Sequence, residues 1–317
     1  MLKISVVIPA YNESARIHRS IQSVLRQTQP VNEIIVVDDG STDGTADIVA
    51  QYADQVTCIR QTNQGLAAAR NTGIKQATND WIAFLDADDE WLPGHIENAW
   101  KLLSQYPDIV WYCAAFELRS EDGKILSNPS MADPSLHDGI LNNYFMIQAN
   151  TSFSCASSMI VQKFVFDKVG VFNVEISQHG EDLDMWYRIA LLYPQIGYSC
   201  TAGCIYWRRK GSITTKDHKT DIPRYLRRIN ITYSTSKGLK RDSNRESDYL
   251  IQTWVIYAIK YAIKQKDRQS LVLIKENFNA LLPRHWKFIC WFFQNPIALE
   301  IVQFALAIRF HIRSSVD

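Results

Sequence analysis

The sequence predicts an α/β fold, with a mixed, mostly parallel sheet followed by a helical C-terminal tail. Two observations support this prediction. In the first half of the 317-residue chain, short β-branched and apolar runs alternate with stretches of helical pattern, which is typical of βαβ units. Beyond Lys216 only helical patterns remain, broken at Pro223, Pro283 and Pro296. We therefore expect one large domain over residues 1–215 and a helical tail over residues 216–317.

The expected elements of the large domain follow one another in a regular order. Strands are expected at residues 4–8, 33–37, 56–59, 81–85 and 108–118, and helices at residues 14–27, 44–52 and 66–76. Ligands of open α/β sheets bind beyond the carboxyl ends of the strands. The residues that follow each strand are therefore the candidates for a functional site.

Charge is divided unevenly along the chain. Residues 1–207 have a net charge of −11 and residues 208–317 a net charge of +12, although the whole chain carries only +1. This asymmetry indicates either an anionic partner for the basic part or attraction between the two parts. We expect no nucleic acid partner. The N-terminal apolar run is too short for a signal peptide, which predicts a cytoplasmic protein.

The second strand is followed by Asp38 and Asp39 and then by a glycine-containing turn. A carboxylate here could accept hydrogen bonds from a nucleotide base or a ribose hydroxyl. The alternative is a capped turn, with Asp43 or Thr45 as the N-cap of the next helix. The residues alone do not separate these two interpretations.

The fourth strand is followed by four acidic residues within five positions, Asp86, Asp88, Asp89 and Glu90. Such crowding is costly unless a cation neutralises it. Carboxylate oxygens suit Mg²⁺ or Mn²⁺, which bind through one or two carboxylates and substrate phosphates. An acidic surface loop is the alternative, but the apolar residues before the turn place it at the sheet edge and favour a metal.

Two helices carry further candidates. The helix at 66–76 begins with small residues, which allow close packing on the sheet, and presents Arg70 to a phosphate or to an acidic residue. A later helix opens with Glu181 and Asp182. Acids in a first turn are typical of capping and dipole complementation, and for these residues alone that interpretation is favoured.

Taken together and in order, these segments resemble glycosyltransferase family 2. The resemblance covers about residues 3–212 and rests on Pro-Ala-Tyr-Asn-Glu, Val-Asp-Asp-Gly-Ser-Thr-Asp-Gly-Thr, Asn-x-Gly-x-Ala-x-Ala-Arg-Asn, Phe-Leu-Asp-Ala-Asp-Asp, Val-Gly-x-Phe and Glu-Asp-Leu-Asp-Met-Trp. It implies the GT-A fold, a Rossmann-like nucleotide-diphospho-sugar transferase architecture. It also implies an inverting, metal-dependent hexosyltransferase of polysaccharide biosynthesis, with a UDP-sugar as donor and a glycan or lipid-linked acceptor. A sugar nucleotidyltransferase is disfavoured, because no glycine-rich loop follows the first strand.

The resemblance also implies roles for individual residues. Asp182 would be the catalytic base, and Asp88, in the Asp-x-Asp (DxD) motif, would bind Mn²⁺ or Mg²⁺. Donor binding would involve Pro9, Ala10, Tyr11, Glu13, Asp39, Arg70, Asp86 and Ala87. An inactive nucleotide- or glycan-binding module of the same fold is the alternative, and the presence of both Asp88 and Asp182 disfavours it.

The chain departs from the family pattern at one position. The family often has a histidine in a Tyr-Arg-x-His-x-x-Ser pattern, and here Arg209 stands in its place. A third protein ligand to the metal is therefore not expected. Arg208, Arg209 and Lys210 would contact the diphosphate instead, or would form a basic surface turn.

The tail contains two apolar, aromatic stretches, at residues 286–293 and 297–312, neither long enough to span a bilayer. Basic flanking residues make a helix pair at the membrane interface one interpretation, which would place the enzyme at the inner face of the cytoplasmic membrane. Packing on the catalytic domain or on another subunit is the slightly favoured alternative.

Overall fold

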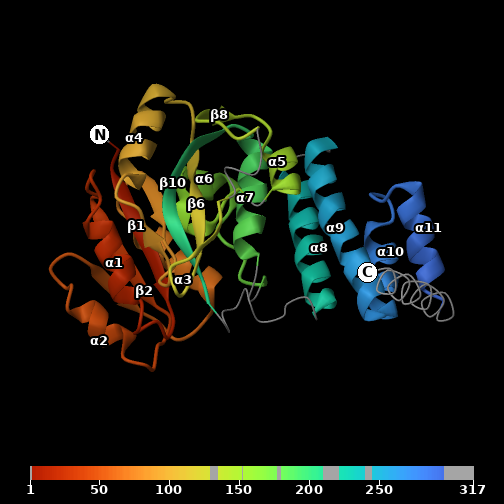
Figure 1. Cartoon of the computed structure of the whole chain (residues 1–317), viewed down its shortest axis with the longest axis horizontal. Coiled ribbons are helices and arrows are strands. Elements are labelled where there is room, and N and C mark those ends of the chain that lie inside the picture. Colours follow the sequence, from red (N-terminus) through yellow and green to blue (C-terminus); the bar gives the residue numbers. More distant parts are fainter. Residues whose placement is uncertain are drawn as a thin grey trace, which may run out of the picture. The chain divides into compact units, whose positions relative to one another are not determined.

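The computed structural model describes residues 2–128, 135–151, 153–176, 180–209, 221–239 and 245–295. The chain forms two compact units. One comprises residues 1–216 with 238–241, and the other comprises residues 217–237 with 242–317. The first unit is an α/β structure, and the described part of the second is helical (Figure 1).

The strands of the first unit are β1 (Ile4–Ala10), β2 (Glu33–Asp38), β3 (Thr57–Arg60), β4 (Trp81–Phe84), β5 (Glu90–Trp91), β6 (Trp111–Ser120), β7 (Ile125–Ser127), β8 (Gly139–Leu141), β9 (Met159–Gln162) and β10 (Ile196–Arg208). Its helices are α1 (Ile17–Leu25), α2 (Thr45–Ala50), α3 (Leu66–Gln76), α4 (His95–Gln105), α5 (Tyr144–Asn150), α6 (Phe164–Val169) and α7 (Glu181–Leu192). The second unit contains α8 (Ile222–Leu239), α9 (Arg245–Gln265), α10 (Arg268–Phe278) and α11 (Arg284–Phe293).

One mixed sheet forms the centre of the first unit, in the order β3-β2-β1-β4-β9-β6-β10-β5. β3, β2, β1 and β4 are parallel, β9 runs against both of its neighbours, and β10 is parallel to β6. In the register, Ala10 lies opposite Asp38, so β1 and β2 end side by side. The mostly parallel α/β sheet expected from the sequence is confirmed, and its parallel half brings the predicted donor segments to one edge.

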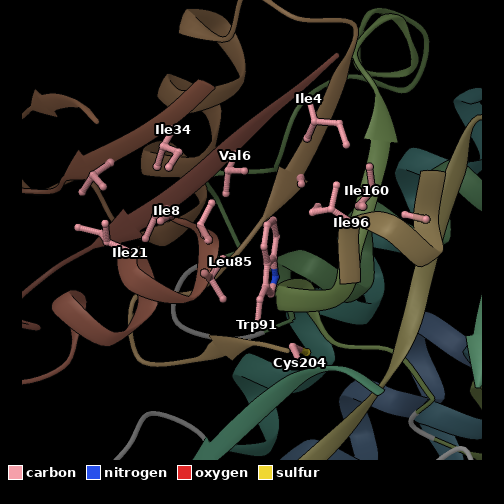
Figure 2. Close-up of a cluster of buried hydrophobic side chains, with 14 of the residues drawn as sticks. Ile4, Val6, Ile8, Ile21, Ile34, Leu85, Trp91, Ile96, Ile160 and Cys204 are labelled. Carbon is pink, nitrogen blue, oxygen red and sulfur yellow. The ribbon is translucent and has the colours of Figure 1, made fainter. Parts of the chain in front are cut away.

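The sheet is covered on both faces, and β1 shows how its alternating side chains divide between them. Ile4, Val6 and Ile8 are buried in one cluster with residues of α1, α2 and α4 (Figure 2). Val7 points to the opposite face, where it meets Gly73 of α3. Because both faces are packed, the parallel strands are apolar at nearly every position, as expected for buried parallel sheets.

The second unit is held together by aromatic and cationic side chains on neighbouring helices. The Arg228 guanidinium lies 4.7 Å from the Tyr225 ring centre and 4.8 Å from that of Trp254, which joins α8 to α9. α11 packs on α10, with the Arg268 Nε donating to the Gln294 carbonyl at 2.8 Å. Among the helices that the structure describes, none has both the length and the hydrophobicity needed to cross a membrane.

Replacing Gly73 by alanine should destabilise the first unit. A Cβ at this position would lie 2.2 Å from Val7 Cγ1, and overpacking of this kind costs about 1–3 kcal/mol. Gly238→Ala is the control, because a Cβ there meets nothing within 4 Å. Urea unfolding measures both variants, and equal midpoints for them would show that α3 does not approach β1 this closely.

Candidate active site

Two loops at the carboxyl edge are joined by side chains of their own residues. The Asn12 N–H donates to Ser41 Oγ at 2.9 Å, and the Thr42 N–H donates back to Asn12 Oδ1 at 2.8 Å. The Glu13 N–H donates to Thr45 Oγ1 at 2.9 Å. Asn12 has φ of 55°, in the left-handed region that Asn tolerates better than most residues. The loop after β1 is thus fixed to the loop after β2, with Tyr11 exposed above them.

The predicted N-cap of α2 (Thr45–Ala50), Asp43 or Thr45, differs by one residue from the N-cap in the structure. Gly44, with φ of 87°, is the N-cap of α2 and has no side chain of its own with which to cap that end. The Asp43 carboxylate instead accepts hydrogen bonds from Thr45 and from the Ser14 N–H. Burial alone would raise the pKa of Asp43, but these hydrogen bonds outweigh it and lower that pKa to about 2. Because these bonds hold the chain at Ser14, α1 begins at Ile17 and not at residue 14 as expected.

Asp39 is a positioning group in this structure. Its carboxylate accepts hydrogen bonds from Gln61 Nε2 at 2.8 Å and from the backbone N–H groups of Gln64 at 2.9 Å and Gly65 at 2.8 Å. The side chain is buried. Asp39 therefore fixes the entrance to α3, and the donor contact expected for it stays a prediction.

Arg70 joins two acidic segments beneath the site. Its Nη2 donates to Asp86 Oδ1 at 2.7 Å and its Nη1 to Glu181 Oε1 at 2.6 Å, while its guanidinium carbon lies 5.3 Å from the Phe172 ring centre. The side chain is only 1% exposed. Of the two roles expected for Arg70, the structure shows the bracing of acidic residues. The direct contact with the donor that is expected for Arg70 stays a prediction.

Asp182 follows Glu181 in the first turn of α7 and lies in the half-buried rim of this cluster. Burial, and next the charge of Glu181, raise the pKa of Asp182 to about 6, although Arg70 acts in the opposite direction. Gly180 is the N-cap of α7, and Asp182 Oδ1 accepts a hydrogen bond from the Leu183 N–H of the first turn at 2.8 Å. Glu181 is paired with Arg70, whereas Asp182 bonds a backbone N–H of the first turn, in keeping with the capping interpretation. Asp182 is also a carboxylate able to take up a proton near neutral pH.

The three aspartates after β4 have different environments. Asp89 is 1% exposed and accepts hydrogen bonds from Ser157 Oγ at 2.5 Å and from the Trp207 N–H at 3.1 Å. Burial, with the neighbouring carboxylates, raises the pKa of Asp89 well above its usual value. Asp86 and Asp88 keep side chains that are 24% and 25% exposed. Asp89 thus holds the turn, and Asp86 and Asp88 face the edge of the sheet.

Arg209, at the end of the β10 region, is paired with two of these acids. Its Nη2 lies 2.6 Å from Glu13 Oε1 and 2.6 Å from Asp88 Oδ2. Burial, and next the charge of Asp88, raise the pKa of Glu13, while Arg209 acts to lower it. The guanidinium is therefore paired with Asp88 through its Oδ2.

The remaining expected contacts are partly described. Pro9, Ala10 and Ala87 are buried along the strand ends. Arg208 is exposed at the end of β10. Lys210 lies outside the described residues.

The acidic turn after β4 offers carboxylates that could bind a divalent cation. Among the described residues, no group of three His, Cys, Asp or Glu side chains could hold a metal. Mg²⁺ and Mn²⁺ need only one or two carboxylates when substrate phosphates supply further oxygens. Asp86 and Asp88 meet that requirement, since each is bonded to its arginine through a single oxygen and is partly exposed.

Three residues that the sequence did not single out support the site. Ser157 accepts a hydrogen bond from the Asp86 N–H at 3.1 Å and donates to Asp89. Arg19 donates to the Asp88 carbonyl at 2.7 Å and lies 4.4 Å from the Trp207 ring centre. No sequence spacing marks Ser157, Arg19 or Trp207, because each bonds to the turn from at least 68 positions away.

Comparison with known proteins identifies the family and the GT-A fold of the chain. The family model for glycosyl transferase family 2 matches residues 5–170, and the chain belongs to this family. Succinoglycan biosynthesis protein ExoW of Rhizobium meliloti is 29% identical over 249 residues, which cover 72% of this chain and 75% of ExoW. In three other curated relatives the match spans 53%, 31% and 58% of the relative's length.

Solved structures show the same fold. TarS 1–349 of S. aureus, in complex with UDP-GlcNAc, has a TM-score of 0.69 and 18% identity, with 89% of this chain and 82% of that chain covered. The mannosyltransferase PcManGT of Pyrobaculum calidifontis, in complex with GDP-Man and Mn²⁺, has a TM-score of 0.53 and 17% identity, with 95% and 86% covered.

Removing Arg70 should destabilise the fold strongly. In Arg70→Ala the buried Glu181 and the partly exposed Asp86 lose their counter-charge, and breaking a buried pair of this kind costs about 3–5 kcal/mol. Lys101→Ala removes an exposed pair with Glu97 in the same unit and should leave the unfolding midpoint unchanged. If chemical denaturation gave the two variants the same midpoint, Arg70 would not be the brace described here.

Proposed function

We propose that this protein is an inverting glycosyltransferase that moves a sugar from a UDP-sugar to a hydroxyl of a glycan or lipid-linked acceptor. The observation that carries the proposal is Asp182, a half-buried carboxylate with a pKa raised to about 6, at the rim of the acidic edge. A role in bacterial cell-surface polysaccharide synthesis is supported by the name of ExoW. A nucleotide-sugar donor is supported by the UDP-GlcNAc bound to TarS.

Inversion requires one base and no protein nucleophile. In the proposed reaction the acceptor hydroxyl oxygen attacks the anomeric carbon from the face opposite the diphosphate. Asp182 accepts the hydroxyl proton as the bond from the anomeric carbon to the diphosphate oxygen breaks. A carboxylate with a pKa near 6 is largely deprotonated at neutral pH and is more basic than an exposed aspartate, which suits this task.

The leaving diphosphate requires positive charge. A divalent cation held by Asp88, with Asp86, would supply a Lewis acid that stabilises this charge. Arg209 is placed to contact the diphosphate if the donor draws it from Glu13 or Asp88. We assign contact with the diphosphate to Arg208 and Lys210 as well. Tyr11, Glu13 and Asp39 would contact the donor. The enzyme would act in the cytoplasm.

Asp182→Asn should abolish transfer and leave donor binding nearly unchanged. The amide cannot take the acceptor proton, and loss of a general base lowers kcat by about 10²–10⁴-fold. In the unsubstituted enzyme kcat/KM should rise as pH increases through about 6, because the active form of Asp182 is deprotonated. Asp80→Asn, an exposed carboxylate at the start of β4, is the control. An unchanged turnover in Asp182→Asn would remove Asp182 from the mechanism.

A UDP-sugar with Mn²⁺ should raise the thermal unfolding temperature of the protein, because a ligand that binds only the folded state stabilises it. Asp88→Asn should lose the part of this shift that depends on Mn²⁺ and keep the part that the nucleotide gives alone. A panel of nucleotide-diphosphate sugars that gave no shift would exclude the donor site. A shift without turnover would identify an inactive binding module.

A further inference from the structure

Helix α11 has an outer face made of aromatic side chains. Phe288 and Trp291 are each 59% exposed, the largest exposures among the big apolar side chains of the described part of the chain. The Phe288 ring centre lies 5.7 Å from that of Trp291 and 6.0 Å from that of Phe292, so the rings form one patch. The opposite side of the helix packs inward through Cys290, which is fully buried.

Basic residues lie next to this patch on the same helix. Arg284 precedes Phe288 by four positions and Lys287 precedes Trp291 by four, so each lies one turn from an exposed ring. α11 contains no Asp or Glu. The described residues of the second unit, 221–239 and 245–295, contain 12 Lys and Arg against 5 Asp and Glu.

Exposed aromatic rings beside basic residues favour an anionic lipid surface over a second copy of the chain as the partner of this face. Isologous contact with the same face of a second copy would bring two strongly basic units together, which electrostatic repulsion opposes. An anionic lipid surface has the complementary charge, and its headgroup region accepts Phe and Trp rings while Arg and Lys reach the phosphates. We propose that the outer face of α11, formed by Arg284, Lys287, Phe288, Trp291 and Phe292, docks on an anionic membrane surface.

The geometry suits a helix that lies in the plane of the interface and does not cross it. α11 is 10 residues long, and a spanning helix needs about 20. Trp has an apolar ring and a polar N–H, which places it at the boundary between headgroups and acyl chains. The proposal goes beyond sugar transfer, and its failure would leave the donor-binding experiment unaffected.

The test is sedimentation of the full-length protein with vesicles at low salt. Binding is expected to vesicles of phosphatidylcholine mixed with phosphatidylglycerol, to be much weaker with phosphatidylcholine alone, and to fall as salt rises. F288S/W291S should weaken binding by at least roughly tenfold, since two rings lose their burial. Lys287→Glu should weaken it by at least roughly fivefold.

A matched control distinguishes binding through this face from non-specific hydrophobic adsorption to vesicles. F164S/V174S removes two exposed apolar side chains from the first unit, 42% and 58% exposed, and should bind like the original protein. Equal loss of binding in both double variants, or the absence of binding to anionic vesicles, would overturn the proposal. So would a change of molar mass by light scattering in F288S/W291S, because the face would then be an interface between copies of the chain.

A second measurement needs no variant and holds even if F288S/W291S fails to fold. Vesicles with brominated acyl chains quench tryptophan that reaches the acyl boundary, and the original protein should lose part of its emission on binding them. Unchanged emission at full binding would place the contact away from Trp291 and would contradict the proposed face.

Discussion

The buried ion pairs of Arg70 are the constraint on which the active site depends. Asp86 comes from the end of β4 and Glu181 from the start of α7, and one guanidinium bonds to both. Without that charge, two carboxylates would be crowded at the sheet edge beside Asp182, and burial would favour their protonation. The arginine thus allows the acids at the end of β4 and at the start of α7 to stay close to one another. It also makes α3 a structural part of the site.

The parallel half of the fold could be predicted from the sequence, because its strands are apolar runs separated by helices of ordinary length. Asp38, Asp86 and Asp88 could be placed at the correct edge for the same reason. The partners of Arg70 could not be derived, since 111 positions separate it from Glu181. Ser157 and Trp207 were missed because they support the site through hydrogen bonds to Asp89 that only the fold brings about. Neither residue type indicates such a bond in the sequence. The start of α1 was misjudged because bonds to Thr45 and Asp43 control it.

Arg209 gives the acidic edge a neutralising group of its own. Its guanidinium spans Glu13 and Asp88, so two segments that the chain separates widely are held together before any ligand arrives. A donor diphosphate would offer this arginine another anionic partner, and a cation would offer Asp88 another positive one. If Arg209 moves from Asp88 to the diphosphate and the cation binds Asp88, the net charge of the site changes little. Such an arrangement keeps the electrostatic cost of binding low.

The joined loops after β1 and β2 have a consequence for engineering this enzyme. Asn12 and Ser41 bond to one another across the two loops, and Glu13 is bonded to Thr45. A loop grafted alone from a relative would leave backbone N–H groups of its neighbour without acceptors, at a cost of about 1–3 kcal/mol for each buried group. Chimaeras with a relative should therefore exchange residues 11–14 and 41–45 together, so that the N–H groups of each loop keep their acceptors in the other.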